Sequence, residues 1–270
     1  MRRKAKQKRV VARSIELIPV AGLPEIQPGD DLAALVHQTC RSNRKPLRSG
    51  DILVLAQKIV SKAEGALVDL RTVVPSDKAL ALAAKRTALR PELAGTANDP
   101  RFLEVVLQQS RRIVRDEHVL IVETHHGFVC ANAGVDHSNV LGQDMVTVLP
   151  RDPDGAAASL TRDLRKLTGV SIAVIISDTF GRPWRLGLTN VAIGAAGLPV
   201  LLDLRGKRDR IRKPLQATVL AVADELAAAA GIVMGKADGI PAVIVRGYRF
   251  QASKQQAAAI LRRAQEDLFR

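Results

Sequence analysis

The chain has 270 residues, of which 47% are hydrophobic and 25% are charged, a composition typical of a well-packed globular protein with one large or two modest domains. No apolar run approaches the roughly 20 residues of a membrane-spanning helix, and Glu16 and Pro19 interrupt what would be a signal-peptide core. The sequence therefore predicts a cytoplasmic protein without a membrane partner, in which Cys40 and Cys130 are reduced and buried.

The net charge of +14 is concentrated at the N-terminus, where seven Lys and Arg residues occupy the first thirteen positions. Such a segment is typical either of a solvated, disordered tail or of an arm that binds nucleic acid, and we favour a tail over residues 1–14. The rest of the chain is still basic, which suits ligands with phosphate or carboxylate groups. One tyrosine and five phenylalanines supply no stacking platform for single-stranded nucleic acid, so a nucleic-acid-binding protein is the less favoured alternative.

Apolar runs and turn signals predict alternating strands and helices through the first half of the chain. Strands are predicted at 16–20, 50–65 and 118–124, and a strand that leads into a loop at 128–136. Helices are predicted at 30–40, at 78–89 with a cap at Ser76 or Asp77, and at 101–113 after the Asp99-Pro100 pair.

The second half continues this alternation. It predicts helices at 157–169 and 218–231, strands at 171–177 and 242–247, and a closing helix at 254–269 capped by Ser253. The order lacks a strict strand–helix–strand rhythm. We therefore predict a mixed α/β (α+β) fold rather than a doubly wound parallel sheet.

Three predicted loops gather polar residues at strand ends, where side chains can converge. They hold Asn132, Asp136, His137, Ser138 and Asn139, then Asp178, Thr179, Arg182 and Arg185, then Met234 to Pro241 with Lys236. The carboxylates of Asp136 and Asp178 and the hydroxyl of Thr179 suit Mg²⁺ or Mn²⁺, which usually also hold substrate phosphates. On spacing alone, an aspartate that follows a strand is more often a turn or cap residue than a metal ligand.

Two glycine-rich or basic segments resemble anion sites without matching a known motif. GIVMGKA, which contains Lys236, is not a P-loop, because that motif has four residues between its glycines and Ser or Thr after the lysine. Lys236 could still bind a phosphate, or Gly235 could simply end a helix. Residues 205–214 carry six cations and one acid, which fits either a solvated loop or an anion clamp. His125 and His126 have no third ligand at useful spacing and are interpreted as structural.

Nine segments follow one another from about residue 15 to the C-terminus: LIPVAGLPEI, QKIVSKAEG, DPRFLEVVL, ETHHGFVCANAGVDHSN, SDTFGRPWR, TNVAIGAAGLP, LRGKRD, AVADELAAAA and VMGKADGIP. Together they resemble the coenzyme F420-0:L-glutamate ligase family. The resemblance implies a ligase domain over residues 15–270, with two subdomains and an intertwined homodimer. Some family members add a flavin-binding, nitroreductase-like domain, which we expect to be absent because the sequence ends at Arg270.

The resemblance also implies an activity and its site. Family members are GTP- and metal-dependent ligases that add L-glutamate through γ-linkages to the phospholactyl side chain of F420-0. It implies Asp136, Asp178 and Thr179 as ligands of Mg²⁺ or Mn²⁺, as one ion or two, and leaves a role for K⁺ open. It implies guanine-nucleotide contacts from Leu23, Pro24, Glu25, Ile26, Gln57, Lys62, Asn139, Met234, Gly235, Lys236, Ala237 and Asp238. Position 57 is often serine in relatives, and Gln57 can form similar hydrogen bonds.

The residues and the resemblance favour one mechanism, in which the acceptor carboxylate attacks the γ-phosphate of GTP and glutamate then displaces phosphate from the acyl phosphate. Asp178 is expected to be catalytic. Arg182 and Arg185 are expected to grip carboxylates, or else to fix their loop by pairing with nearby acids. The sequence departs from the family pattern at Leu188, Arg212 and Val219. The alternative is therefore a ligase of the same fold that uses a different or modified acceptor.

Overall fold

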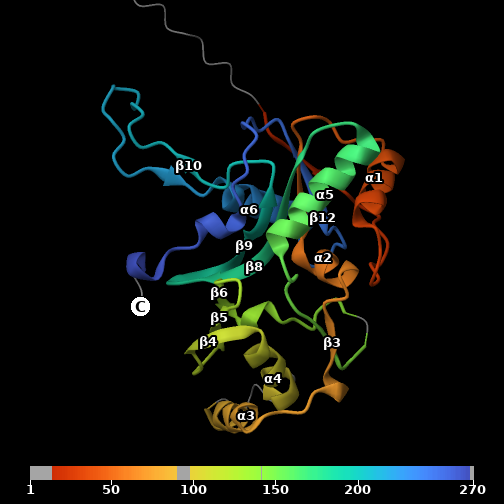
Figure 1. The fold of residues 1–270 in the computed structure, drawn as a ribbon, viewed down its shortest axis with the longest axis vertical. Helices are drawn as coiled ribbons and strands as arrows, with labels where there is room; N and C mark the ends of the chain where they lie inside the picture. The colour runs from red at the N-terminus through yellow and green to blue at the C-terminus, as the bar shows by residue number, and fades with distance from the viewer. Residues whose placement is uncertain (1–13, 90–97, 141, 268–270) are drawn as a thin grey trace, which may run out of the picture.

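The computed structural model describes residues 14–89, 98–140 and 142–267, and it confirms a mixed α/β fold (Figure 1). Its centre is a five-stranded sheet in the order β1-β12-β2-β8-β9. In that order the strands span Glu16–Pro19, Ala242–Arg246, Ile52–Ala56, Ala173–Arg182 and Arg185–Ala196. Only β2 and β8 pair in parallel, and the other neighbours are antiparallel. The predicted N-terminal tail lies outside the described residues except for Ser14.

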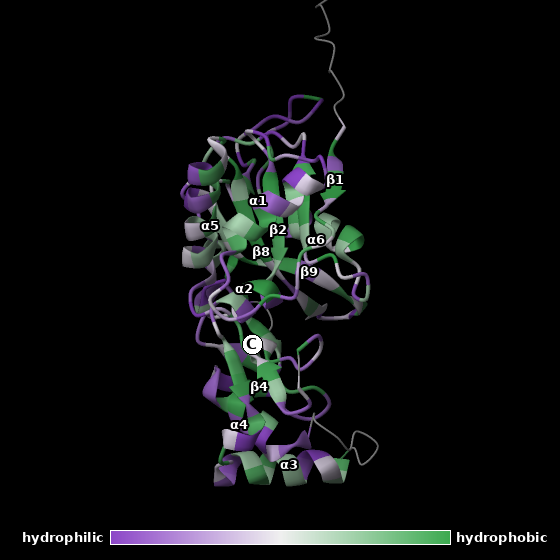
Figure 2. Ribbon diagram, turned by 90° about the vertical axis from the view of Figure 1, so that its right-hand side faces the viewer, coloured by the Kyte–Doolittle hydropathy of each residue, from purple (hydrophilic) through white to green (hydrophobic). Residues whose placement is uncertain are grey.

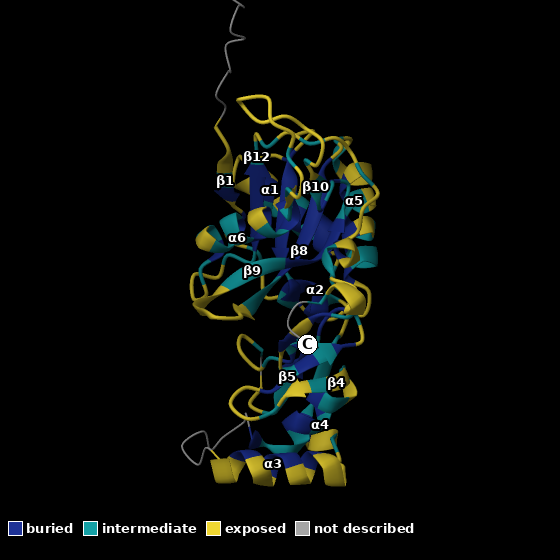
Figure 3. Ribbon diagram, turned by 90° about the vertical axis from the view of Figure 1, so that its left-hand side faces the viewer, coloured by how far each residue is buried: buried dark blue, intermediate teal, exposed yellow. Residues whose placement is uncertain are grey.

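Helices cover both faces of this sheet. Helices α1 (Leu32–Ser42) and α5 (Pro153–Thr168) lie on one face and α6 (Val222–Met234) on the other (Figure 1). Successive residues of a strand point to opposite faces, so Leu53 and Leu55 join the hydrophobic cluster under α1 and α5, whereas Ile52 and Val54 join the cluster under α6. All four side chains are fully buried. Figures 2 and 3 show the middle of the sheet, at β2 and the inner part of β8, as an apolar, buried layer.

A third hydrophobic cluster lies at the far end of the molecule (Figures 1 and 2). It contains Phe102, Leu103, Leu120 and Val122, all buried. Its buried residues come mainly from α3 (Asp77–Leu89), α4 (Pro100–Gln108) and β5 (Ile121–Thr124), and β5 pairs in antiparallel with β4 (Ser110–Arg115) and β6 (Val129–Ala131). Strands β3 (Leu67–Asp69) and β7 (Met145–Thr147) pair with each other and bring Val68 and Val146 to this cluster. No helix in the described ranges is long and apolar enough to cross a membrane.

The predicted strand at 50–65 is wrong in its second half, because the chain turns into helix α2 (Gln57–Ala63) directly after Ala56. The residues up to Leu55 are buried on both faces, as a central strand requires, whereas Ile59, Val60 and Ala63 follow helical spacing and pack under α1 and α5. This turn places the polar first turn of α2 at the end of β2. Helix α2 thereby starts at the edge of the site described below.

Two predicted helices are also corrected. The helix at 101–113 ends at Gln108, since Ser110–Arg115 forms strand β4, in which Arg112 pairs with Glu123 across the sheet at 2.8 Å. The closing helix at 254–269 is replaced by short 3₁₀ turns at Ala257–Ile260 and Ala264–Glu266, although Ser253 does accept the N–H of Gln255. Tertiary hydrogen bonds override the alanine-rich sequence there. They run from Ala257 and Ala258 to Asp154, and from Val200 and Leu201 to Gln255.

The predicted loop SDTFGRPWR is a β-hairpin. Strand β8 continues to Arg182, and β9 begins at Arg185, so that Pro183 and Trp184 alone form the turn. Trp184 adopts a φ of 57°, the left-handed conformation that such a tight turn requires. The predicted helix at 218–231 starts later, because Val219–Leu220 forms β11, which pairs with β10 (Leu202–Asp203). The β10–β11 loop projects away from the sheet (Figure 1).

Both cysteines are free and buried, as predicted. Burial is the main cause that raises the pKa of Cys40 to about 11 and that of Cys130 to about 12. Since the thiolate is the reactive form, we expect native protein to lose less than about a tenth of its thiols to iodoacetamide at about pH 8 while the unfolded chain reacts fully. Intact-mass measurement with and without guanidinium checks this. Rapid labelling of native protein would contradict the buried positions.

Candidate active site

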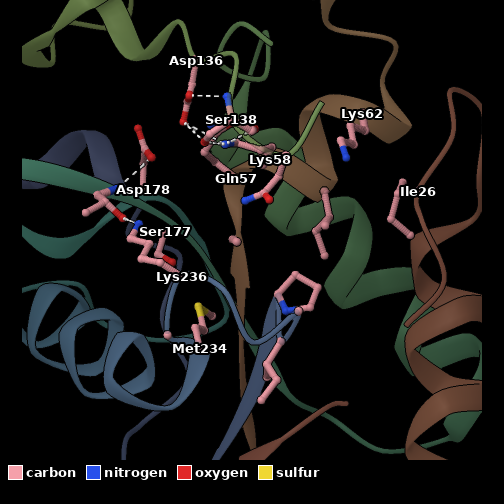
Figure 4. Close-up of a pocket in the computed structure, with 18 of the residues that line it drawn as sticks. Ile26, Gln57, Lys58, Lys62, Asp136, Ser138, Ser177, Asp178, Met234 and Lys236 are labelled. Atoms are coloured by element: carbon pink, nitrogen blue, oxygen red, sulfur yellow. Dashed lines mark hydrogen bonds and ion pairs between the residues drawn. The ribbon is translucent and has the colours of Figure 1, made fainter. Parts of the chain in front are cut away.

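A cavity of about 630 Å³ opens where β2 gives way to α2 (Figure 4). The loop after β1, the first turns of α2 and the loop after β6 form one part of its wall. The middle of the β8–β9 hairpin and the loop after α6 form the rest. Segments from Leu23 to Pro241 therefore meet at one place, because the central sheet brings the ends of several strands to the same edge.

Most of the residues predicted from the sequence lie in this cavity. The lining includes the three expected metal ligands, Asp136, Asp178 and Thr179. It also includes eleven of the twelve expected nucleotide contacts: Leu23, Pro24, Glu25, Ile26, Gln57, Lys62, Asn139, Met234, Gly235, Lys236 and Ala237. The exception is Asp238, which does not line the cavity. Its carboxylate lies close to Gly235, since a Cβ added to Gly235 would stand 2.1 Å from Asp238 Oδ2.

Asp136 and Asp178 approach the cavity from different elements, and Figure 4 shows both side chains on the same side of it. Asp178 belongs to β8, not to a loop, and desolvation raises its pKa to about 6. The N–H of Thr179 and the charge of Lys236 offset only part of that effect, and the charge of Asp136 adds to it. Asp178 therefore stands in the site as a carboxylate without enough nearby positive charge.

The pKa of Asp136 is shifted in the opposite direction to that of Asp178. Burial by itself would raise its pKa, but hydrogen bonds from Lys58 and from the N–H of Ser138 lower it below its ordinary value. The Lys58 ammonium lies 2.8 Å from Asp136 Oδ2 and 2.7 Å from both the carbonyl and the hydroxyl oxygen of Ser138. Lys58 thus ties the first turn of α2 to the loop that follows β6.

Lys62 lies on the opposite side of the cavity from Asp178, on the same side as Ile26 (Figure 4). Its side chain is only 8% exposed and forms an ion pair with Glu25. Gln57 is also buried and accepts a hydrogen bond from Ser61 at 2.8 Å, one turn further along α2. Helix α2 therefore presents a buried ammonium and a buried amide to the cavity.

A second lysine, Lys236, reaches the cavity from the loop after α6. Its ammonium donates to the hydroxyl of Thr179, which in turn donates to Asn190 Oδ1 at 2.9 Å. Asn190 packs against α6 where Gly231 leaves space for it, because an added Cβ there would lie 2.8 Å from the Asn190 side chain. The orientation of the Thr179 hydroxyl is thus fixed by two neighbours.

The donor set fits a hard divalent cation. Two carboxylates and a hydroxyl face one space, and oxygen ligands of this kind suit Mg²⁺ or Mn²⁺. Within the described ranges no group of three or more His, Cys, Asp or Glu side chains forms a metal site. A cation here would therefore need further oxygens from water or substrate, which is the usual situation for Mg²⁺ bound together with phosphates.

Other predicted residues lie elsewhere. Arg182 and Arg185 do not line the cavity; they stand at the exposed end of the β8–β9 hairpin, where Arg182 donates to the carbonyl of Leu186 at 2.6 Å. The loop 205–214 is exposed and also lies outside the lining. His125 and His126 bind backbone carbonyls, at 2.9 Å to Gln108 and 3.0 Å to Pro150, which agrees with a structural role.

The structure adds site residues that sequence reasoning missed, chiefly Lys58 and Asn190. Lys58 was hidden because residues 50–65 were interpreted as a strand, which would send Gln57 and Lys58 to opposite faces. Asn190 stands in the segment TNVAIGAAGLP, whose polar start before an apolar run was a usable signal. Leu188 also lines the cavity, so one of the departures from the family pattern lies within the site.

The comparisons with known proteins agree with one another. A sequence model of the F420-0:gamma-glutamyl ligase family matches residues 22–247. A coenzyme F420:L-glutamate ligase of Methanothermobacter thermautotrophicus is 46% identical over 260 residues, which is 95% of this chain and 99% of that protein. Proteins with the same description from Methanopyrus kandleri and Methanocaldococcus jannaschii are 44% and 38% identical, over 95% and 96% of this chain and 98% of each relative. This chain belongs to the F420-0:gamma-glutamyl ligase family.

Proposed function

We propose that this chain is a GTP-dependent ligase that joins L-glutamate through its amino group to the phospholactyl carboxylate of F420-0, and that further glutamates can follow through γ-linkages. The observation that carries the proposal is the gathering of Asp136, Asp178 and Thr179 with Lys62 and Lys236 around one cavity. The relatives from Methanothermobacter thermautotrophicus and Methanopyrus kandleri are named coenzyme F420:L-glutamate ligases, and this chain matches nearly the whole length of each. The site offers cation ligands and ammonium groups together, as phosphoryl transfer requires.

The proposed reaction has two steps. A carboxylate oxygen of the acceptor attacks the γ-phosphorus of GTP, the bond to the bridging oxygen breaks, and GDP leaves. The amine of glutamate then attacks the acyl carbon, phosphate leaves, and the amine loses a proton to give the amide. Lys62 and Lys236, on opposite sides of the cavity, would bind the phosphates as point charges. A bound Mg²⁺ or Mn²⁺, held by Asp136, Asp178 and Thr179, would neutralise charge that develops on the phosphate oxygens.

The nucleotide fits the part of the cavity nearest α2. Leu23, Pro24 and Ile26 supply an apolar surface, and the buried amide of Gln57 supplies hydrogen bonds. Both features suit a purine base, and the amide can pair with the polar edge of guanine. The proposal includes one or two Mg²⁺ or Mn²⁺ ions, and K⁺ as a further cation.

The subunit arrangement is proposed from the same family. The separate hydrophobic cluster around α3 and α4 supports two subdomains, one around the central sheet and one around this cluster. The end of the β8–β9 hairpin exposes large apolar side chains, with Trp184 79% and Leu186 97% exposed. Exposed apolar groups of this size on one hairpin favour burial against a second subunit, as in the expected intertwined homodimer. Sedimentation at micromolar protein concentration would distinguish a dimer from a monomer.

Mass spectrometry of the products tests the function. Protein is incubated with F420-0, L-glutamate and Mn²⁺, with GTP or ATP, and with EDTA in a parallel reaction. We expect glutamyl-extended F420 only with GTP and metal, and the product series counts the glutamates added. Absence of extended product from folded protein that still binds GTP would contradict F420-0 as the acceptor.

That outcome would favour the second candidate, a ligase of the same fold with a different or modified acceptor. Its support is Leu188, one of the departures from the family pattern, which lines the cavity although 68% exposed. Arg212 and Val219 lie on or beside the projecting β10–β11 loop and do not line the cavity. A change of acceptor would therefore act first through Leu188.

Arg182 and Arg185 are proposed to bind carboxylates of the acceptor or of glutamate at the outer end of the hairpin. The inner part of the same hairpin, at Leu188 and Asn190, lines the cavity. We expect Arg182→Ala and Arg185→Ala each to raise one Michaelis constant by about 10-fold, since a lost charged hydrogen bond contributes about 1.5–3 kcal/mol. Steady-state kinetics with glutamate and F420-0 varied separately checks this. Unchanged constants for both substrates would leave these arginines with a role in the hairpin alone.

A further inference from the structure

The formal positive and negative charges around the cavity are equal in number before any ligand enters, although burial leaves Asp178 only partly compensated. Lys58, Lys62 and Lys236 line it together with Glu25, Asp136 and Asp178. Lys62 is paired with Glu25, which leaves Lys58 and Lys236 beside the two aspartates. A dication added alone would therefore create an excess of positive charge, and a nucleotide added alone would bring its phosphates against two carboxylates.

Oxygens of Asp136 and Thr179, two of the residues expected to hold a metal ion, already accept hydrogen bonds from lysine side chains. A carboxylate oxygen offers about two acceptor positions. Both positions on Asp136 Oδ2 are used, by the Lys58 ammonium at 2.8 Å and by the Ser138 hydroxyl at 2.9 Å. Oδ1 accepts the N–H of Ser138 at 2.7 Å. Lys58 thus stands where an incoming cation would compete for Asp136.

The ammonium of Lys236 donates a hydrogen bond to the Thr179 hydroxyl in the same manner. The hydroxyl hydrogen of Thr179 points to Asn190, so its lone pairs are the groups available to a cation, and Lys236 takes one of them. Both ammonium groups sit on long, flexible side chains that can move to a new partner without a change in the backbone. The side chain of Lys58 is 17% exposed and borders open cavity.

We propose that Lys58 and Lys236 are internal counter-cations that hold the oxygens of Asp136 and Thr179 until nucleotide arrives, so that metal and nucleotide bind as a coupled pair. The nucleotide phosphates receive the two ammonium groups, and the freed oxygens become available to the divalent cation. Lys58 carries the larger share of this effect, because it forms three hydrogen bonds at the Asp136 loop. This inference rests on the proposed function, since it takes Asp136 and Thr179 as the metal ligands.

Metal binding measured without turnover tests the proposal. Free Mn²⁺ is quantified by electron paramagnetic resonance in titrations of the protein, with and without β,γ-imido GTP. For the unchanged protein we expect nucleotide to tighten Mn²⁺ binding by about 10- to 100-fold, the usual range of coupling between two sites. In Lys58→Met we expect Mn²⁺ alone to bind about 10-fold tighter and the gain from nucleotide to shrink by a similar factor, because both changes belong to one thermodynamic cycle.

Two further variants separate charge from structure. Lys58→Gln keeps a hydrogen-bond donor near Asp136 and Ser138 but removes the charge, so it should reproduce Lys58→Met even if the latter is less stable. Lys78→Met removes an exposed lysine on α3, far from the cavity, and should leave both affinities unchanged. The complex that Mn²⁺ forms with nucleotide in solution is common to every titration and cancels in these comparisons.

The outcomes are distinct. Tighter Mn²⁺ binding and weaker coupling in both Lys58 variants support the counter-cation role. If Mn²⁺ binds to the unchanged protein but both variants behave like Lys78→Met, the role of Lys58 is overturned and the metal site stands. If no protein binds Mn²⁺ even with nucleotide, the metal site of the proposed function is overturned, and this inference with it.

Discussion

Replacing Asp178 with asparagine is expected to lower kcat/KM for glutamyl transfer by about 10³-fold or more, because the substitution removes a charge that helps to stabilise the transition state. Asparagine keeps the shape of the side chain but cannot provide the negative charge that a divalent cation needs. Asp178 is the carboxylate with the least compensation in the cavity, since desolvation raises its pKa to about 6. A bound cation would supply the missing charge.

The same substitution is expected not to destabilise the protein. The folded-state pKa of Asp178 lies above its ordinary value of 3.8, so its contribution to stability is present at low pH and is lost as the pH rises through about 6. Above that pH the ionised carboxylate opposes folding, and asparagine removes this effect. We therefore expect an equal or higher melting temperature for Asp178→Asn at neutral pH. Loss of activity with retained stability is typical of a residue held for function.

The control is Asp163→Asn, which removes a half-buried carboxylate on α5 that pairs with Lys166 at 2.9 Å. This pair lies on the surface and should affect neither activity nor stability appreciably. Initial rates of product formation and thermal denaturation, followed on the three proteins side by side, check both expectations. Activity in Asp178→Asn within tenfold of the unchanged protein would contradict the catalytic role of Asp178.

The ion pair between Arg246 and Asp51 is expected to give the largest effect on stability. Asp51 is 1% exposed and precedes β2, and Arg246 ends β12, the neighbouring strand. Two parallel hydrogen bonds join them, Nε to Oδ1 at 2.8 Å and Nη2 to Oδ2 at 2.7 Å. Arg246 also donates to the carbonyl of Pro46 at 2.9 Å. This pair fixes the end of the sheet that lies away from the cavity.

Arg246→Met is expected to lower the free energy of unfolding by about 3–5 kcal/mol, because it leaves a buried carboxylate without its charged partner. Methionine keeps most of the side-chain volume, so the loss of stability would come from the missing charge and not from a cavity. In the double variant Arg246→Met, Asp51→Asn the loss should be smaller than the sum of the single losses, since the buried charge is gone. Denaturant unfolding measures all three.

A matched control uses a surface pair. Arg162→Met breaks the exposed contact with Asp163, at 3.5 Å, and should change the free energy of unfolding by less than about 1 kcal/mol. A loss below that value for Arg246→Met would mean that the carboxylate of Asp51 finds other partners, such as the N–H of Arg48, which already lies 2.8 Å from its Oδ2.

Much of the fold followed from local patterns in the sequence. The runs before Ala56 and before Asp178 are continuous and apolar, which predicts central strands buried on both faces. Asp31 caps α1 and Asp99 caps α4, in agreement with the acidic starts of those predicted helices. These features depend only on residues close in the sequence, so they could be recognised without knowledge of the tertiary structure.

The errors arose where distant residues decide the structure. Residues 254–267 have a helical composition, yet Asp154 and the backbone near Val200 draw them into 3₁₀ turns. The β8–β9 hairpin contains polar and glycine residues that are typical of a loop, but ten and twelve residues pair into strands because β8 is already anchored in the central sheet. Neither contact could be inferred from local spacing.

In the site, too, features that depend on local sequence could be predicted, and features that depend on distant contacts could not. The position of Asp178 beyond an apolar run indicated a place where polar side chains gather, and the resemblance to the ligase family supplied its expected partners. The role of Lys58 depends on the turn between β2 and α2, which periodicity misread, and on a contact with Asp136 across 78 positions. Residues that act through a partner far along the chain carry little signal of their own.

Anomalous scattering from crystals of the protein grown with Mn²⁺ and β,γ-imido GTP would locate metal and nucleotide together. We predict a manganese peak about 2.0–2.3 Å from oxygens of Asp136, Asp178 and Thr179, with phosphates beside Lys62 and Lys236 and the base near Gln57. A manganese peak elsewhere, or nucleotide on the basic loop 205–214 with the 630 Å³ cavity empty, would contradict the assignment of this cavity as the active site.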